Sequence, residues 1–227
     1  MHAHVAIDGP VAGGKTTVAR LLARELGYLY LDTGAMYRAV AVMGLRYGVE
    51  LDSERAVLEV VREHAVHVEL DTHGDRGYRV FAGGLELGEE LFAREVAAVV
   101  SVVAAHPAVR DELTQRQREI AALGPVVMAG RDIGTIVLPD APVKIFLTAS
   151  VEARVQRRFE EYSRQGNPPD LAHLRAQIEE RDRIDRSRAV APLRVAEGAV
   201  VIDSSDLTPE AVVQMIHARV RAVAAVR

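Results

Sequence analysis

Near its N-terminus the chain reads Gly9-Pro10-Val11-Ala12-Gly13-Gly14-Lys15-Thr16-Thr17. This stretch fits the pattern G-x-x-x-x-G-K-[ST], in which small residues allow backbone N–H groups to curl around a phosphate. A short apolar run, 4–8, precedes it and predicts a buried strand. Apolar residues at helical spacing follow it and end at Gly27. The sequence therefore predicts a strand, a phosphate-binding loop and a helix, in that order.

Two side chains at the end of this loop carry its expected chemistry. Of the 28 lysine and arginine residues, only Lys15 and Lys144 are lysines. A lysine at position 15 is therefore unusual in a chain that mostly uses arginine for its positive charges. A compact ammonium, rather than a planar guanidinium, is suited to the terminal phosphates of a nucleotide. The hydroxyl of Thr16 is placed to bind the magnesium ion that accompanies such a nucleotide.

Composition narrows the class of protein. The 227 residues are 49% apolar, which is enough for one large α/β domain or for a core with an insert. The net charge of −4 argues against binding to a nucleic-acid polymer, which usually requires a basic face. The absence of cysteine excludes disulfides, thiolate zinc sites and cysteine nucleophiles. The longest apolar run, 96–105, is too short to span a bilayer, and we expect a cytoplasmic protein.

The remaining pattern alternates buried strands with helices, which predicts a parallel sheet covered on both faces. About five strands are expected in this sheet, at 4–8, 28–31, 125–129, 142–147 and 199–203. Helices are expected from 35, over 49–62, over 95–122 with a break at Pro107, from 150, from 171 and from 208. Three further short runs, 67–70, 78–81 and 85–87, are separated by Gly- and Asp-rich turns, so they predict a small antiparallel insert.

Several polar residues follow the predicted strands directly. Thr33 and Arg38 come after the strand 28–31, and Arg131 and Asp132 come after the strand 125–129. Open parallel sheets bind ligands at the carboxyl ends of their strands, so we expect these residues near the phosphate loop. A plainer interpretation makes Thr33 a helix cap and Arg38 a solvated side chain.

Two further polar residues lie within the predicted helices. Ser101 interrupts an apolar run, and Arg110 follows Pro107 by three positions. Periodicity alone favours a structural role for both of them.

The charged segment from Arg181 to Arg188 allows two interpretations. Mixed charge on a helix usually marks a solvated face with i,i+4 pairs, a spacing that Arg181 and Asp185 have. The guanidinium groups outnumber the carboxylates beside them, however, and the chain turns abruptly at 189–192. An arginine-bearing flap over a phosphate loop suits phosphoryl transfer, because cations stabilise the charge on the equatorial oxygens of the transition state. Closure of the flap would also exclude water.

Taken together, these motifs resemble the bacterial cytidylate kinases, a family of P-loop nucleoside monophosphate kinases. The resemblance runs nearly end to end, and it rests on the phosphate loop, on 32–38, on 101–117, on 130–135 and on 181–193, together with the three-stranded insert. It implies a P-loop kinase fold, with a five-stranded parallel sheet flanked by helices. It also implies transfer of the γ-phosphoryl group of ATP to CMP or dCMP in pyrimidine metabolism, with Mg²⁺ as cofactor.

The resemblance implies a set of site residues. The ATP phosphates would be bound by Gly9, Pro10, Val11, Ala12, Gly13, Gly14, Lys15, Thr16 and Thr17, and Thr16 is the one metal ligand expected. The acceptor phosphate would be bound by Thr33, Arg38, Arg131 and Arg188, cytosine by Ser101, Arg110 and Asp132, and ribose by Arg181 and Asp185. Lys15, Arg131 and Arg188 are the expected catalytic residues. Arg154 and Arg157 are possible adenine contacts from their position near the lid, and we select Arg157.

The resemblance also implies how the chain is divided. The core would comprise 1–32, 90–154 and 189–227, the monophosphate-binding region 33–89, and the lid 155–188. We expect a monomer. One departure from the family pattern is Ala129, because the family usually has an aspartate before Gly-Arg-Asp. That acid helps to hold the hydration shell of magnesium in many P-loop enzymes.

Three alternatives stay open at this point. Another small-molecule kinase, acting on AMP, UMP or shikimate, would share the loop and the lid and differ only in its acceptor pocket. A GTP-dependent switch would use the D-x-x-G match at 71–74, although the sequence has no N-K-x-D signature. A metal-binding protein would use His64 with His67, or His2 with His4.

Overall fold

The fold is taken from a computed structural model of the chain, which describes residues 4–71, 74, 76–164, 166 and 168–225. Five strands form the main sheet, in the order β2-β6-β1-β7-β8. Strand β1 pairs in parallel with β6 and with β7, and β7 pairs in parallel with β8. The strands are β1 (Val5–Asp8), β2 (Leu29–Asp32), β6 (Val126–Gly130), β7 (Val143–Thr148) and β8 (Val200–Asp203). The predicted fold class is confirmed.

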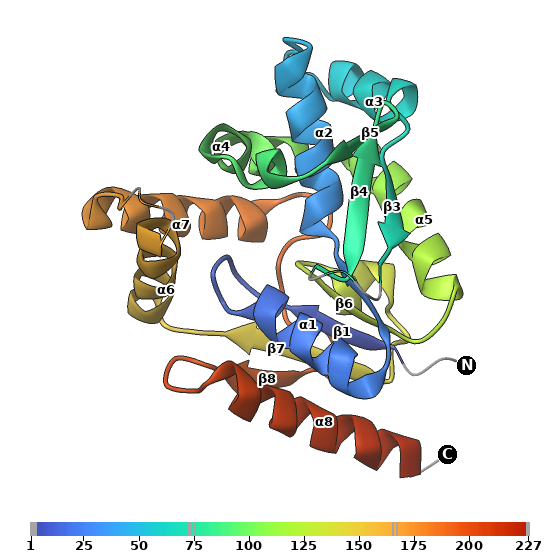
Figure 1. Ribbon diagram of the computed structural model, residues 1–227, viewed down its shortest axis with the longest axis vertical. Coiled ribbons are helices and arrows are strands. Elements are labelled where there is room, and N and C mark those ends of the chain that lie inside the picture. Colours follow the sequence, from blue (N-terminus) through green and yellow to red (C-terminus); the bar gives the residue numbers. More distant parts are fainter. Residues whose placement is uncertain (1–3, 72–73, 75, 165, 167, 226–227) are drawn as a thin grey trace. The chain divides into compact units, whose positions relative to one another are not determined.

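The chain divides into two compact units, Met1–Gly27 with Val127–Arg227, and Tyr28–Val126. The predicted domain boundaries are a different division, and they stay a prediction. In the first unit, α1 and α8 pack against each other beside β1 and β7 (Figure 1). The helical elements of this unit are α1 (Lys15–Leu26), η2 (Ile133–Val137), α6 (Val151–Arg164), α7 (Leu171–Ser187) and α8 (Pro209–Ala225).

Apolar side chains at strand and helix spacing form the core of the first unit. Its largest fully buried side chains include Ile7, Leu22, Met128, Ile145, Leu147 and Ile216. A second apolar cluster joins α6 to α7 through Val155, Leu174 and Ile178, and Val11 of the phosphate loop packs against it. The helix pair is thereby attached to the loop by burial of apolar surface.

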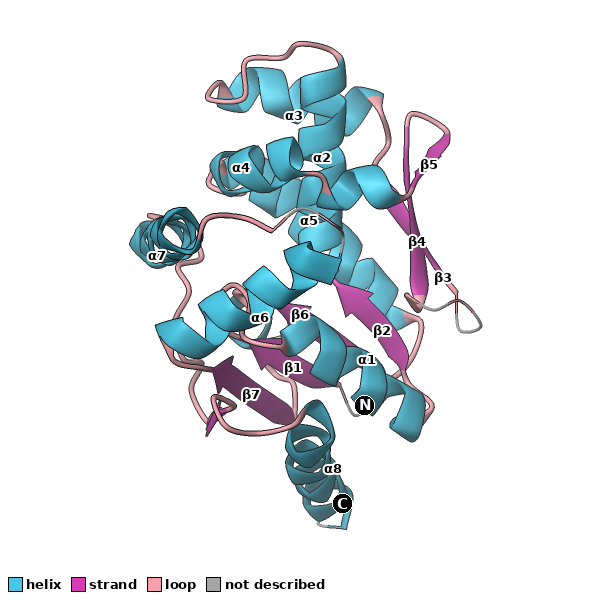
Figure 2. Ribbon diagram, turned by 60° about the vertical axis from the view of Figure 1, so that its left-hand side comes forward, coloured by secondary structure: helices cyan, strands magenta, loops and turns pink. Residues whose placement is uncertain are grey.

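The second unit contains the three-stranded sheet. Its strands have the order β3-β4-β5 and are antiparallel, as the sequence predicted (Figure 2). They are β3 (His67–Leu70), β4 (Tyr78–Ala82) and β5 (Leu85–Leu87). The helical elements are α2 (Gly34–Arg46), α3 (Glu54–Glu63), η1 (Glu89–Phe92), α4 (Arg94–Val103) and α5 (Pro107–Ala122).

Two local features differ from the sequence prediction. The helix expected from residue 49 begins at Glu54, because Ser53 has an extended backbone and caps the helix by accepting a hydrogen bond from Ala56 N. The turn η2, which follows Asp132, is a single π-helical turn that the sequence did not indicate. Such turns are rare and are often found at functional sites.

Candidate active site

The phosphate loop connects β1 to α1, and its glycines are required by the backbone. Gly9 has a φ of +153°, and a Cβ atom there would lie 2.0 Å from the carbonyl oxygen of Leu147 on β7. Gly14 has a left-handed φ of 84° at the N-cap of α1. Only glycine suits both positions, and the N-terminus of α1, which favours a bound anion, follows Gly14 directly.

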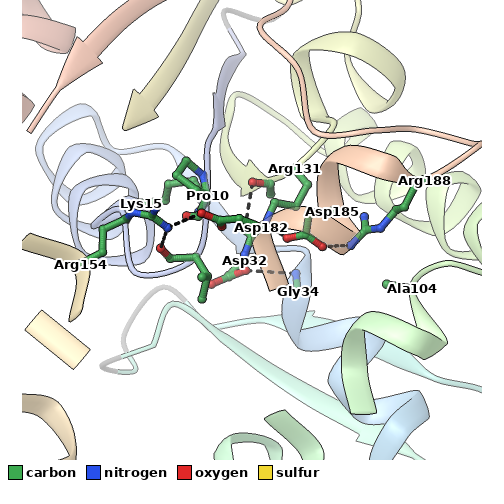
Figure 3. Close-up of polar contacts among 12 residues, drawn as sticks. Pro10, Lys15, Asp32, Gly34, Ala104, Arg131, Arg154, Asp182, Asp185 and Arg188 are labelled. Atoms are coloured by element: carbon green, nitrogen blue, oxygen red, sulfur yellow. Dashed lines mark hydrogen bonds and ion pairs between the residues drawn. The ribbon is translucent and has the colours of Figure 1, made fainter. Parts of the chain in front are cut away.

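Lys15, the first residue of α1, lies over this bend. Its side chain is buried, and Nζ donates a hydrogen bond to the carbonyl oxygen of Pro10 at 2.7 Å (Figure 3). The ammonium is therefore held at the loop by the loop's own backbone. Thr16 follows it at the start of the helix and is exposed. An anion bound in the bend would meet a positive charge and a hydroxyl from consecutive residues.

Asp8, which the sequence analysis did not single out, lies directly before the phosphate loop. It is the last residue of β1, and its side chain is 2% exposed. Its two carboxylate oxygens accept hydrogen bonds from Ile133 N and Gly134 N, each at 2.7 Å. Burial raises the pKa of Asp8 to about 6, although both N–H groups and the charge of Lys15 oppose this change. The sequence did contain a signal for Asp8, because it is an ionisable residue at the end of an otherwise apolar strand.

Arg131, Asp185 and Arg188 form a charged cluster in the first unit. Arg131 Nε donates to Asp185 Oδ2 at 2.7 Å, and Arg188 Nη2 donates to Asp185 Oδ1 (Figure 3). Asp185 lies on α7, and its side chain is only 1% exposed. Burial acts to raise the pKa of Asp185, but the positive charges of Arg131, Arg188 and Arg181 outweigh it and hold this pKa below its usual value.

This cluster bears on the two interpretations of the segment 181–188. The carboxylate of Asp185 is not part of a solvated face, because it is buried between two guanidinium groups. Asp132, the neighbour of Arg131, is also buried, at 4% exposure. The structure therefore brings four predicted site residues of the first unit, Arg131, Arg181, Asp185 and Arg188, into one electrostatic group.

Arg154 connects the helix pair to the phosphate loop. Its Nη1 lies 2.6 Å from Asp182 Oδ2 on α7 and donates to the carbonyl oxygen of Val11 at 3.2 Å. Its Nε donates to the carbonyl oxygen of Ala149 at 3.1 Å. The guanidinium is buried and holds three parts of the unit together, which indicates a structural role for Arg154.

Arg157, one helical turn further along α6, lies beside the loop. Its Nη1 donates to Ser204 Oγ at 3.1 Å, and its Nη2 donates to the carbonyl oxygen of the same residue. The hydroxyl of Ser204 in turn reaches the carbonyl oxygen of Gly13 at 3.5 Å. A Cβ atom at Gly14 would lie 3.7 Å from Arg157 Nη1. Arg157 is therefore placed next to the predicted ATP loop.

The second unit holds Thr33 and Arg38 near the start of α2. Asp32 Oδ1 accepts a hydrogen bond from Gly34 N at 3.0 Å, which satisfies a backbone donor at this helix end, and Thr33 is buried. Arg38 Nη1 donates to the carbonyl oxygen of Leu91 at 3.0 Å. Its guanidinium carbon lies 5.5 Å from the centre of the Phe92 ring. Arg38 is thus an oriented side chain rather than a freely solvated one.

Ser101 and Arg110 lie on α4 and α5 of the second unit. Both are buried, at 6% and 3% exposure. Arg110 Nη1 donates to the carbonyl oxygen of Ala104 at 3.0 Å, and its guanidinium carbon lies 5.3 Å from the centre of the Tyr37 ring. Burying a guanidinium group without partners is unfavourable. Arg110 has two partners, Ala104 and Tyr37, and they orient its guanidinium inside the second unit.

The alternative sites find little support. His64 stacks on Tyr47 and His67 stacks on Phe81, and the described part of the chain contains no group of three or more His, Asp or Glu residues placed to hold a metal ion. Of the D-x-x-G match, Asp71 accepts from Gly74 N at 2.8 Å, while 72 and 73 lie outside the described residues. His2 also lies outside them. Among the helices that are described, none has the length and apolarity needed to cross a membrane.

Comparison with known proteins identifies the family. The family model of cytidylate kinase matches residues 5–222. A cytidylate kinase of Pelotomaculum thermopropionicum is 50% identical over 219 residues, which cover 96% of this chain and 96% of that protein. The cytidylate kinase of Anoxybacillus flavithermus is 50% identical over 212 residues, with 93% of each chain covered.

Among solved structures, a shikimate kinase from Acinetobacter baumannii in complex with shikimate has a TM-score of 0.42 and 20% identity, covering 98% of this chain and 94% of that one. So distant a likeness does not bear on the acceptor. The match to the family model spans nearly the whole chain and includes the phosphate loop, the Arg131–Asp132 segment and α7. The chain therefore belongs to the cytidylate kinase family.

Proposed function

We propose that this protein is an ATP-dependent nucleoside monophosphate kinase that transfers the γ-phosphoryl group of ATP to CMP or dCMP. The products are ADP and CDP or dCDP. The observation that carries this proposal is the match to cytidylate kinases over 5–222, in a chain whose phosphate loop and buried arginine cluster suit phosphoryl transfer.

ATP would be bound by the first unit. The backbone of 9–17 would surround the phosphates, with Lys15 at the terminal ones. Arg157 would contact the nucleotide from α6, where Ser204 already orients it beside Gly13 and Gly14.

The residues at the loop fit a magnesium ion held mainly by the nucleotide and by water. Thr16 is exposed and carries a hydroxyl group. Each oxygen of Asp8 already accepts a hydrogen bond from a backbone N–H group. Ala129 has no carboxylate that could contribute. Mg²⁺ keeps several waters in such sites and binds through few protein oxygens. When bound, it would neutralise charge on the transferred phosphoryl group.

The acceptor phosphate would be bound by Arg131 and Arg188 of the first unit, and by Thr33 and Arg38 of the second. Asp185 holds the first two guanidinium groups in place, so little reorganisation is needed when negative charge develops on the equatorial oxygens. No catalytic base is assigned, because the attacking atom is a phosphate oxygen that is already ionised at neutral pH.

The nucleoside would be recognised by buried polar groups. Cytosine presents a 4-amino donor where uracil presents a carbonyl, so an acceptor at Ser101 or Asp132 favours cytosine, while Arg110 can donate to the O2 and N3 edge. UMP would place an acceptor against an acceptor and be disfavoured. Arg181 and Asp185 would bind the ribose hydroxyls.

The segment 155–188, which comprises most of α6 and α7, would act as the lid and exclude water when it closes, because hydrolysis of bound ATP would otherwise compete with transfer. We further propose that the protein acts in the cytoplasm as a monomer.

The test is a coupled assay of ADP release with CMP, dCMP, UMP, AMP and shikimate as acceptors. We expect the highest kcat/KM with CMP or dCMP, and formation of one ADP for each acceptor phosphorylated. A clear preference for AMP, UMP or shikimate would contradict the proposed substrate. ADP release that does not depend on any acceptor would contradict the proposed reaction.

A further inference from the structure

We infer that Asp8 is a positioning residue for the acceptor, because it fixes the Arg131–Asp132 turn against the first residue of the phosphate loop. Asp8 directly precedes Gly9, while its carboxylate binds the two residues that directly follow Asp132. One side chain thus connects the ATP-binding segment to the segment proposed to bind the acceptor. The inference rests on the proposed function of Arg131 and Asp132.

The sheet register makes this contact possible. In the parallel pairing of β1 with β6, Asp8 lies opposite Gly130, which has no side chain. The chain leaves β6 there, passes through Arg131 and Asp132, and enters η2 at Ile133. Asp8 can therefore reach past the end of β6 to the N–H groups of Ile133 and Gly134.

The two hydrogen bonds fix orientation as well as position. Each oxygen of Asp8 binds a different one of two consecutive backbone N–H groups, at 2.7 Å in both cases. Rotation of this peptide segment would break at least one of them. Because only Asp132 separates Ile133 from Arg131, a displaced η2 would carry Asp132 with it and change the direction from which Arg131 reaches Asp185.

A carboxylate is chemically required for this double contact. Asparagine has the same shape but only one acceptor oxygen, so its amide group would face an N–H donor. The buried carboxylate is itself unfavourable, and it is compensated by the two N–H groups and by the charge of Lys15, while the charge of Asp132 opposes it. We therefore expect the buried carboxylate of Asp8 to have a role beyond filling space in the core.

Gly134 offers an independent way to disturb the same contact. A Cβ atom at this residue would lie 3.3 Å from Asp8 Oδ2 and 3.1 Å from Ala196 Cβ. The change Gly134→Ala would therefore press on the carboxylate without altering its chemistry. If Asp8→Ala does not fold, Gly134→Ala still tests the contact.

The experiment compares Asp8→Asn, Asp8→Ala and Gly134→Ala with the wild-type protein. For each variant one measures the Tm, the Kd for ATP by displacement of a fluorescent analogue, and kcat and KM for CMP and UMP. We expect the KM for CMP to rise about tenfold in Asp8→Asn and more in Asp8→Ala, since hydrogen bonds to a charged group are lost. The preference for CMP over UMP should fall, while the Kd for ATP should change by no more than about twofold.

The matched control is Thr208→Ala. Thr208 caps α8, where its Oγ1 accepts a hydrogen bond from Ala211 N at 3.2 Å, and it lies outside the lid and outside the proposed site. We expect this variant to lower the Tm and to leave the KM for CMP and the preference over UMP unchanged.

Two outcomes would overturn the inference. One is a lower Tm in all three variants with an unchanged KM for CMP and unchanged preference, which would make Asp8 purely structural. The other is an equal loss of ATP and CMP binding, which would place its effect on the phosphate loop. If the wild-type protein uses another acceptor, the proposed function is wrong, and the same comparison made with that acceptor still decides the role of Asp8.

Discussion

Arg131 Nε donates a hydrogen bond to Asp185 Oδ2 at 2.7 Å, although the two residues are 54 positions apart in the sequence. The carboxylate is 1% exposed and is shared with Arg188. Two guanidinium groups are therefore kept close together by one buried negative charge. Such an arrangement is suited to an anion that binds both arginines, because their positions are set before it arrives.

The first prediction concerns this shared carboxylate. Asp185→Asn should reduce kcat/KM for CMP by about a hundredfold, because two neighbouring positive charges lose the group that holds them. The Kd for ATP should change little. The control on the same helix is Glu180→Gln, since Glu180 forms an exposed pair with Arg183 and should have no measurable effect. Steady-state kinetics with CMP provide the measurement, and equal effects of the two changes would contradict the prediction.

The second prediction uses the two lysines of the chain. Lys15→Ala should abolish phosphoryl transfer, because the loop then lacks its charge for the terminal phosphates. Lys144→Ala is the matched control: Lys144 is exposed at its ammonium, donates to the carbonyl oxygen of Glu197 at 3.3 Å, and should retain full activity.

Arg188→Ala completes this set of variants. It should lower kcat far more than it weakens ATP binding, because its guanidinium acts on charge that develops in the transition state. The measurements are the rate of ADP release and the Kd for ATP in Arg188→Ala and in the wild-type protein. Near-normal turnover in both Lys15→Ala and Arg188→Ala would refute the proposed mechanism.

The third prediction concerns nucleobase selectivity in the second unit. Arg110→Ala should raise the KM for CMP and relax the rejection of UMP. Tyr37→Leu should do the same to a smaller extent, about threefold to tenfold, because the ring that orients the Arg110 guanidinium is lost while the charge stays. Tyr37→Phe keeps the ring and should behave like the wild-type protein. The ratio of kcat/KM for CMP and UMP gives the answer.

A second cation–π pair serves as the control for Tyr37. Arg79 lies over the ring of Phe81 at 5.0 Å on the antiparallel sheet, and neither residue is assigned to the site. Phe81→Leu should leave the CMP-to-UMP ratio unchanged. If Tyr37→Leu also leaves it unchanged, Tyr37 does not orient Arg110 for recognition of the base.

The fourth prediction concerns stability. Arg154→Met should lower the free energy of unfolding by about 3–5 kcal/mol, because it leaves the carboxylate of Asp182 buried without its partner. The double variant Arg154→Met with Asp182→Leu should recover much of this loss. Arg183→Ala, which removes an exposed partner of Glu180, should cost no more than about 1 kcal/mol. Chemical denaturation measures all three, and a loss in Arg154→Met as small as in Arg183→Ala would show that the buried pair is unimportant.

The fifth prediction is a dependence of stability on pH. The pKa of Asp8 is raised from 3.8 to about 6 in the folded protein, so between these values the native state holds a proton that the unfolded state has lost. Stability should therefore fall as the pH rises from about 4 to about 6, by up to about 3 kcal/mol from this one group.

The effect of Asp8 is isolated by comparison with Asp8→Asn, which does not titrate at this position. The free energy of unfolding of the wild-type protein minus that of the variant should decrease across this pH window. Asp132 and Lys15 act on Asp8 in both directions, but they are present in both proteins and largely cancel in the difference. A difference that increases with pH would mean that Asp8 is ionised more readily in the folded protein than in the unfolded chain.

The sequence alone was sufficient for much of the fold. The phosphate loop, the alternation of strands and helices, and the antiparallel insert are local patterns, because glycines at a tight bend and apolar residues at a fixed period determine backbone conformation over a few positions. The start of α3 was predicted at residue 49 and lies at Glu54, because Ser53 caps the helix there.

Only the tertiary structure decided which residues far apart in the sequence contact each other. Asp8 binds N–H groups 125 and 126 positions away, and Arg131 meets Asp185 across 54 positions. No local pattern encodes such pairs, because they depend on which strands are neighbours and on where each strand ends. The chain by itself predicted that a phosphate would be bound and by which loop. The folded sheet decided which buried charges would face one another, since burial and distance, rather than residue type, set the strength of an electrostatic interaction.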